Sequence, residues 1–600
     1  MMFGGRSNIV EWSRGEPESR RGQPTDPGEV GRKFFEKWES SGCNKKAHRW
    51  YASFCLSLTF RFIFGTFRSG GVARFVLRII TVGYLNVDIN LPSVNAAGGR
   101  ASDQSNDQFD DGLASEYAVT SAHLVLFDTD DETSAKVHGV FQFTDLKPWN
   151  TDDNIDNVTA NAKSVIKIDV PSVNKSLGAI VMLNAPEDLL TKINNDKPTF
   201  KAFFSEAYVS GAELANTSAD KGFFMTNAPL YDAKSAKARS FVSIPSQSIC
   251  FTREEALTKT PVEIFVERAV AKINVSTINN GAYDLTLDSD KYVATVTGWD
   301  LDITNKKSYI VRNVNAYNGD DGFDVWKDYT SKAGNGLRFY STASNRIYWA
   351  LDPNYNTAQH ADLDANFNTI KVVSSKAIDR SEYILENTFD VANQMRNRTT
   401  RTIIRATFAP EGKDPETFYQ IGSSSTIYDK AGMQTLVKSQ AVKVLTDKTD
   451  AEKYVFASNT SVSATAGEHQ LQFGDVNYDG TDLTKDELDA LNGALGVITT
   501  YKDGICYYVA RIQHFGDTYT PWKNGDPTYG DPGVETDKLY LGRYGVVRNN
   551  WYELQISEIR NLGHPTIPEA PSTPDDENNY YISFKVNIHS WAKRVQNVIL

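Results

Sequence analysis

Apolar and polar residues alternate strictly near the end of the chain, and this alternation predicts a half-buried β-strand over Ile582–His589. A second extended run over residues 591–600 follows it without a Gly, Pro or Asn-Gly turn, so a tight hairpin is not expected between the two. The tail, residues 592–600, therefore has apolar side chains to bury and no predicted partner strand. These side chains are Val595, Val598 and Leu600. Because an unpaired apolar strand aggregates or is completed by another molecule, the chain end predicts assembly.

The same alternation occurs over residues 84–91, where apolar side chains are expected on one face and polar side chains on the other. The apolar face consists of Leu85, Val87, Ile89 and Leu91. A polar segment over residues 92–112, rich in Ser, Asn, Asp and Gly, follows this strand and contains a single arginine, Arg100. Such a composition predicts a loop outside any packed core.

Strand-like runs recur through the rest of the chain, bounded by Pro, Gly, Asn and Asp, whereas helical patterns are scarce. The runs cover residues 117–127, 165–170, 179–183, 200–204, 241–244, 261–277, 292–296, 309–314, 402–408, 504–513 and 551–559. The clearest helical pattern is Lys485–Leu495. The chain is thus expected to be an all-β protein of the sandwich class with few short helices.

The run over residues 261–277 changes its apolar face partway along, which predicts a β-bulge or a switch from one sheet to another. We expect a domain boundary just beyond it, at Asn279-Asn280-Gly281. Since 600 residues exceed the usual size of one domain, the chain divides into domains over residues 81–280 and 281–600.

Residues 1–80 differ in composition from the rest and are predicted to be absent from the mature protein, either as an atypical leader or propeptide or because the gene start is placed too far upstream. Residues 1–83 carry 14 Lys and Arg against 7 Asp and Glu, although the whole chain has a net charge of −12. Their longest charge-free apolar run, residues 50–60, is too short to span a bilayer. Cys43 follows Ser-Ser-Gly and weakly resembles a bacterial lipoprotein cleavage site, but the apolar segment that precedes such a site is missing. The net negative charge argues against nucleic acid as a partner.

One segment has the ligand spacing of a calcium-binding loop. Asp475, Asn477 and Asp479 occupy loop positions 1, 3 and 5, Gly480 follows, and Asp486 stands at position 12. A structural calcium ion is one interpretation, and a solvated turn rich in Asp, Asn and Gly is the other. An enzyme is not expected, because no two of the eight histidines have zinc-ligand spacing and no hydrolase, kinase or phosphate-loop motif is found.

Six segments, taken together and in this order, resemble the fimbrillins of Bacteroidetes, in particular the minor-fimbrium shaft pilin family. They read GYLNVDINL from residue 83, SEYAV from 115 with LVLF from 124, VERAVAKI from 266, CYY from 506 with IQHFG from 512, YGVVRNNWY from 544 and SWAKRVQ from 590. The resemblance covers roughly residues 81–600.

This resemblance implies two transthyretin-like β-sandwich domains in tandem and a subunit that polymerises by strand exchange. The first strand, residues 84–91, would be a removable plug, and an arginine-specific protease would cut between Arg100 and Ala101. The tail of the next subunit would then fill the vacated place. The implied partners are other copies of the chain, related fimbrial subunits, the protease, and receptors on host or bacterial surfaces. The implied location is a cell-surface fimbrium, reached as a lipoprotein precursor through the outer membrane.

Two other functions fit the same residues. A tip or accessory fimbrial adhesin would share the fold without repeating along a filament, although a tip subunit has no need of a donor tail. A calcium-dependent glycan-binding surface protein would be centred on the segment from Asp475 to Asp486.

Overall fold

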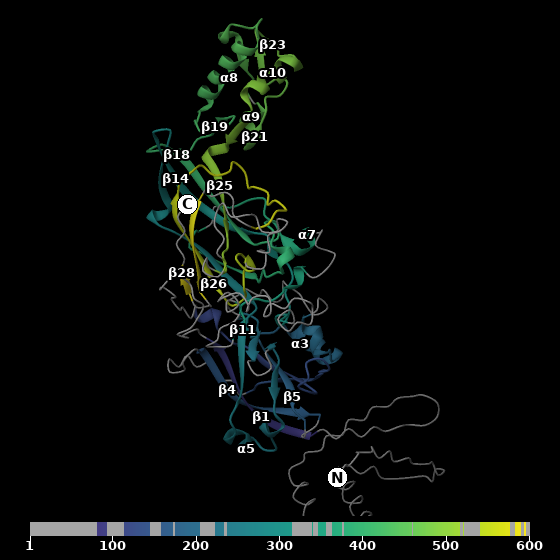
Figure 1. Ribbon diagram of the computed structural model, residues 1–600. Helices are drawn as coiled ribbons and strands as arrows, with labels where there is room; N and C mark the ends of the chain where they lie inside the picture. The colour runs from purple at the N-terminus through teal and green to yellow at the C-terminus, as the bar shows by residue number, and fades with distance from the viewer. Residues whose placement is uncertain are drawn as a thin grey trace, which may run out of the picture. The chain divides into compact units, whose positions relative to one another are not determined.

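The structure is a computed structural model, and it describes most of the chain beyond the predicted leader. The described residues are 81–92, 113–144, 158–171, 175–204, 222–232, 237–314, 339, 346–355, 363–374, 377–458, 460–515, 520, 540–575, 582–589 and 593–595. All of them belong to the second of two compact units, Arg61–Leu600. They form mostly β-strands with few short helices (Figure 1), which confirms the all-β prediction.

The first large sheet has nine strands in the order β10-β1-β11-β6-β5-β2-β3, with β4 pairing with β1 and β9 with β5. Its strands are β1 (Thr81–Pro92), β2 (Ala122–Phe127), β3 (Val137–Gln142), β4 (Val158–Val170), β5 (Leu177–Leu183), β6 (Met225–Asn227), β9 (Val242–Ile244), β10 (Ile249–Cys250) and β11 (Val262–Arg268). Helices α3 (Glu187–Asp196) and α5 (Arg253–Thr258) accompany it. Every residue of β2 is buried, because its two faces contribute to two different apolar clusters.

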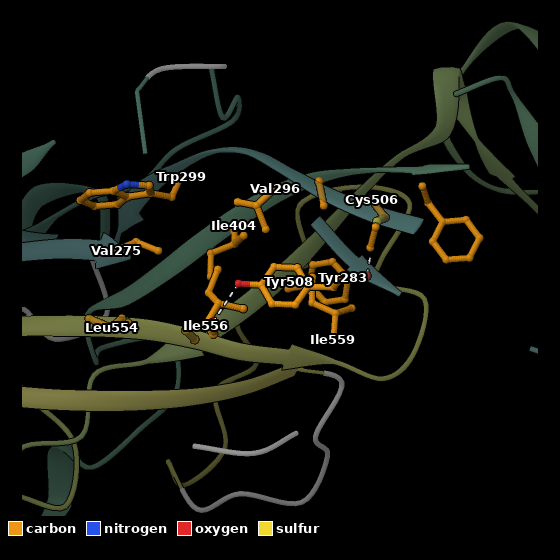
Figure 2. Packing of buried hydrophobic residues seen from close by; sticks show 14 of the residues in the cluster. Val275, Tyr283, Val296, Trp299, Ile404, Cys506, Tyr508, Leu554, Ile556 and Ile559 are labelled. Carbon is orange, nitrogen blue, oxygen red and sulfur yellow. Dashed lines mark hydrogen bonds between the residues drawn. The ribbon is translucent and has the colours of Figure 1, made fainter. Parts of the chain in front are cut away.

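Two further sheets form a second body around a shared core. One has the order β17-β12-β26-β27 with β28 also on β26, and the other has the order β13-β14-β18-β25. These strands are β12 (Val270–Thr277), β13 (Ala282–Leu287), β14 (Asp290–Asp302), β17 (Ser381–Leu385), β18 (Arg401–Pro410), β25 (Ile505–Arg511), β26 (Trp551–Ile559), β27 (Ile582–His589) and β28 (Lys593–Val595). Figure 2 shows side chains of both sheets packed together, with the Tyr283 hydroxyl donating to the Ile556 carbonyl oxygen at 2.8 Å.

A compact insertion lies between β18 and β25, which are neighbours in their sheet. It contains β19 (Phe418–Ile421), α8 (Lys430–Val444), β20 (Tyr454–Phe456), α9 (Ser461–Ala464), β21 (Gly467–His469), β22 (Val476–Tyr478), β23 (Thr481–Asp482), α10 (Lys485–Leu495) and β24 (Ile498–Tyr501). It has an apolar core of its own. The predicted helix Lys485–Leu495 is confirmed as α10, whereas the 15 residues of α8 carried no clear amphipathic pattern and were not predicted. The remaining short elements are β7 (Leu230–Asp232), β8 (Lys237–Arg239), β15 (Thr304–Asn305), β16 (Phe367–Asn368) and α7 (Leu363–Asn366).

The chain passes from the first large sheet to the second body at Ala269, between β11 and β12. Of the two interpretations of residues 261–277, the switch between sheets is therefore confirmed. Strand β12, which comes directly after the switch, pairs with β17 and β26 of the second body. The domain boundary expected at residue 280 lies after β12 and a short turn, and it stays a prediction.

Buried charges surround this switch. The Glu267 carboxylate accepts two hydrogen bonds from Arg312, each 2.7 Å long, and neither side chain is exposed. Lys272 pairs with Glu116 at 2.7 Å, and both are nearly inaccessible. Charged groups are rarely buried unless they are paired, and these pairs balance the charges buried at the switch.

Two of the predicted strands are wrong. Residues Phe200–Phe204 form a 3₁₀ helix, in which Phe200 and Phe203 are both buried, because a helical turn and not a strand brings residues three apart onto one face. Residues 309–314 form no strand beyond an isolated bridge from Asn313 to Leu351. Both segments were predicted as strands because they are rich in aromatic and β-branched residues. In the structure, these residues pack in the core.

Candidate functional site

Strand β1 is the predicted plug, and it is paired along both of its edges. On one edge it pairs antiparallel with β4 along its whole length, from Thr81 opposite Val170 to Pro92 opposite Val158. On the other edge it pairs parallel with β11 over residues 87–90 and antiparallel with β10 at Tyr84 and Leu85. We call the three flanking strands, together with α5, the β1 site. Figure 1 labels β1, β4, β11 and α5 in the same part of the molecule.

The alternation of β1 positions its apolar residues as the sequence predicted. Leu85, Val87, Ile89 and Leu91 are each 0% exposed and belong to the core cluster of the first sheet. At about 1.5–3 kcal/mol for each fully buried side chain, these four residues contribute roughly 6–12 kcal/mol of hydrophobic stabilisation. Strand β1 is therefore a central part of the first sheet and its core.

Close contacts at the start of β1 limit which residues the site accepts. A Cβ atom added at Gly83 would lie 2.7 Å from the Ile249 side chain of β10, so a larger residue at this position requires the Ile249 side chain to move. Helix α5 contacts the next residues, and the Asn86 side-chain amide donates to the Lys259 carbonyl oxygen at 3.0 Å. Sequence alternation could not reveal this size limit, because β10 is two residues long and distant in the chain.

The outward face of β1 carries an unexpected buried acid. Asp88 is 6% exposed, although the alternation predicts that it faces solvent. Its carboxylate lies 3.4 Å from the Lys163 ammonium of β4. Burial raises the pKa of Asp88, and the nearby Lys163 charge partly offsets this effect. No sequence signal distinguished Asp88 from the polar neighbours Asn86 and Asn90.

The predicted donor tail begins beside its own second body. Strand β27 is an edge strand that pairs antiparallel with β26 over residues 582–586. Three residues of the tail, Lys593–Val595, form β28 and pair parallel with β26 at Trp551–Glu553, so the prediction that the tail has no partner strand is wrong for these residues. The donor residues Val598 and Leu600 lie outside the described residues, as do Arg100 and Ala101 of the predicted cleavage site. Their roles stay predictions.

The segment with calcium-loop spacing forms a β-hairpin in the insertion. Strands β22 and β23 pair across the two-residue turn Asp479-Gly480, in which both residues have positive φ. Asp479 pairs with Lys453 at 3.1 Å, and the Asp475 carboxylate accepts from the Gln472 backbone N–H at 2.8 Å. Asp486 lies in the first turn of α10. Among the described residues, no three His, Cys, Asp or Glu side chains are grouped so that they could hold a metal ion.

Thermal unfolding in calcium, in magnesium and in chelator tests the calcium hypothesis directly. A calcium ion bound at Asp475, Asn477, Asp479 and Asp486 predicts a higher Tm in calcium alone, and predicts that Asp479→Asn removes the difference. A hairpin held by protein contacts predicts the same Tm in all three conditions. Asp284→Asn, on the exposed edge of β13, is the matched control for the change of charge.

The two described cysteines, Cys250 and Cys506, are buried and unpaired, so no disulfide joins the described parts of the chain. Burial raises the pKa of the Cys506 thiol to about 11, which makes this thiol a poor nucleophile. In the part of the chain that the structure describes, no helix is long and apolar enough to cross a membrane.

Comparison with known proteins identifies a relationship in the C-terminal part. Residues 499–597 match the family model for the C-terminal region of the major fimbrial subunit protein type IV, fimbrillin. This match includes strands β25 to β28. No curated protein matches the chain.

Several solved structures align with most of the chain at low similarity. A proposed cell adhesion protein from Parabacteroides distasonis ATCC 8503 is 10% identical, with 86% of this chain and 100% of that one covered and a TM-score of 0.35. The tip fimbrial protein Mfa3 from Porphyromonas gingivalis, with a C-terminal truncation, is 10% identical, with 84% and 99% covered and a TM-score of 0.29. A fimbrial assembly protein from Parabacteroides distasonis ATCC 8503 is 11% identical, with 55% and 96% covered and a TM-score of 0.24.

Proposed function

We propose that this chain, whose residues 499–597 match the fimbrillin C-terminal family model, is a structural subunit that polymerises into a cell-surface fimbrium by exchange of strand β1. Cleavage after Arg100 would free β1 from the following segment, and the tail of another copy would take its place. Filaments built in this way would mediate adhesion to host or bacterial surfaces. The polymer would assemble at the cell surface after export through the outer membrane.

The observation that carries this proposal is the position of β1 in its sheet. Its four apolar side chains are fully buried, and both edges are hydrogen-bonded, so its departure would uncover apolar surface and two rows of backbone groups. Refilling this site would recover about 25 cal/mol per Å² of apolar area and would restore the main-chain ladders. Because a tail-to-site contact joins different surfaces of two copies, it leaves each end free to continue.

Proteolysis would supply the trigger for this reaction. Before cleavage, β1 is covalently attached to its own domain and competes with any incoming strand at a very high effective concentration. After cleavage it is a separate fragment that dilutes once it leaves. The exchange therefore requires no nucleotide, and the cut makes it effectively irreversible.

Treatment of a purified 81–600 chain with an arginine-specific protease tests the proposal. We expect filaments by negative-stain electron microscopy and loss of a fragment that ends at Arg100. Deleting residues 592–600 should leave the cleaved chain monomeric, and Arg100→Ala should prevent cleavage at this position and assembly. Arg560→Ala, an exposed site outside the proposed contacts, is the matched control. Monomers that persist after complete cleavage at Arg100 would contradict the proposal.

The rival tip or accessory role predicts a different outcome in the same experiment. A tip subunit would accept a strand but would not repeat, so purified chains would form no filament by themselves. It would instead bind a synthetic peptide with the sequence of residues 592–600 after cleavage. A glycan-binding protein would bind a glycan array without its tail and would lose binding in chelator.

A further inference from the structure

The outward face of β1 carries an acidic residue that is buried without a full set of hydrogen-bond partners in the part of the chain that the structure describes. Asp88 lies in the middle of the strand, and 6% of its surface is exposed. One carboxylate oxygen, Oδ1, is buried and has no hydrogen-bond partner among the described residues. A buried acceptor without a partner typically costs about 1–3 kcal/mol, and more when the group is charged. The folded strand therefore carries an internal penalty.

The charges beside Asp88 offset this penalty only in part. Lys163 on β4 lies opposite it and approaches the other oxygen to 3.4 Å, but the Lys163 side chain is 61% exposed. A hydrated lysine of this kind contributes little to stability. On the opposite edge, the residue in register is Glu263 of β11, which is exposed and carries the same charge as Asp88. Lys259, the residue after helix α5, accepts a hydrogen bond from the Asn86 side-chain amide of β1 through its carbonyl oxygen.

The C-terminal segment has the opposite character. Residues 582–600 contain no Asp or Glu and include Lys585, Lys593 and Arg594. Whatever register or direction a strand from this segment adopts in the β1 site, it cannot place an Asp or Glu side chain where Asp88 now lies. The incoming residue is neutral or basic, and a basic residue would face Glu263.

We propose that Asp88 weakens the hold of the β1 site on its own strand and thereby gives strand exchange its direction, from an acidic strand to an acid-free strand of a second copy. This inference rests on the proposed function and names the partner that the site prefers. Asp88 would favour the release of β1 from its site. Apolar side chains that face the core would be needed both in β1 and in the strand that replaces it.

The test measures how firmly the cut strand is held. In the full-length chain, a recognition sequence for a site-specific protease replaces the residues around Arg100, and the cleaved protein is titrated with urea on a size-exclusion column. The readouts are the urea concentration at which half of the β1 fragment separates, and the rate at which a synthetic peptide of residues 582–600 displaces it. Both readouts are obtained whether or not the strand leaves spontaneously.

Asp88→Asn should hold the strand more firmly, because it removes the buried charge and keeps the shape. We expect peptide displacement to become about tenfold slower, which corresponds to about 1.4 kcal/mol, and the urea midpoint to rise. Lys163→Met should have a small effect in the opposite direction, since it removes an exposed cation 3.4 Å from Asp88. Asp284→Asn on β13 repeats the change of charge outside the β1 site and should leave both readouts unchanged.

Acid should have the same effect as Asp88→Asn on the wild-type protein. The pKa of Asp88 is raised in the folded state, so protonation favours the bound strand and retention improves as the pH falls through this raised pKa. The improvement should be much smaller in Asp88→Asn. Equal displacement rates in the wild type and Asp88→Asn would overturn the inference, even if filaments form. Filaments that never form, despite displacement by the peptide, would instead contradict the proposed function.

Discussion

Glu267→Gln should lower the free energy of unfolding by about 3–5 kcal/mol, the range typical of breaking a buried ion pair. Glu267 accepts hydrogen bonds from the Arg312 Nε and Nη2 atoms at 2.7 Å, and Arg346 Nη2 lies 3.9 Å from the same carboxylate. All three side chains are at most 2% exposed. The substitution would leave two buried guanidinium groups without this anion.

Equilibrium unfolding in urea, followed by tryptophan fluorescence, measures this loss. The matched control is Glu411→Gln, because Glu411 pairs with Lys291 at 3.8 Å while both side chains remain largely in water. That change should cost less than about 1 kcal/mol. A similarly small loss for Glu267→Gln would show that the Glu267 carboxylate is not required to balance the charges of Arg312 and Arg346.

Arg548→Met should destabilise the second body by about 3–5 kcal/mol, because it removes the cation of a buried ion pair. Arg548 is fully buried, and its Nη2 atom donates to Glu386 at 2.6 Å, to the Ser308 hydroxyl at 2.9 Å and to the Tyr309 carbonyl oxygen at 3.1 Å. Methionine fills much of the volume but leaves these acceptors unsatisfied and the Glu386 carboxylate buried without its cation. Arg548→Lys keeps the positive charge but loses the planar guanidinium, so its free energy of unfolding should lie between those of the wild type and Arg548→Met.

The same urea measurement applies, with Arg560→Met as the control. Arg560 pairs with Glu558 at 3.0 Å at a half-exposed site, so its replacement should change the free energy of unfolding by less than about 1 kcal/mol. A wild-type value for Arg548→Met would show that the folded protein does not depend on the pairing of Glu386 with this cation.

The strands of this protein could be predicted well where burial alternates along one sequence segment. Residues 84–91 and 551–559 were both predicted as strands, and β1 and β26 contain them. Prediction failed where apolar residues pack without a ladder, as at Phe200–Phe204, and where a helix lacks a strong amphipathic pattern, as in α8.

The candidate site was predictable in part. Alternation identified the four core-facing residues of β1, because side chains that share one face of a strand recur at every second position of the sequence. The resemblance, and not alternation, suggested the cleavage site and the exchange. The spacing from Asp475 to Asp486 matched a calcium loop, yet its central residues also satisfy a tight β-hairpin turn.

By itself, the sequence determined which apolar residues of β1 turn inward and that residues 582–600 contain no Asp or Glu, since both are properties of neighbouring residues. Only the tertiary structure decided that Asp88 is buried between β4 and β11, and that Glu267 meets Arg312 and Arg346. Burial and ion pairing depend on which strands, distant in the sequence, become neighbours in the fold. The periodicity of a single segment does not determine these neighbours.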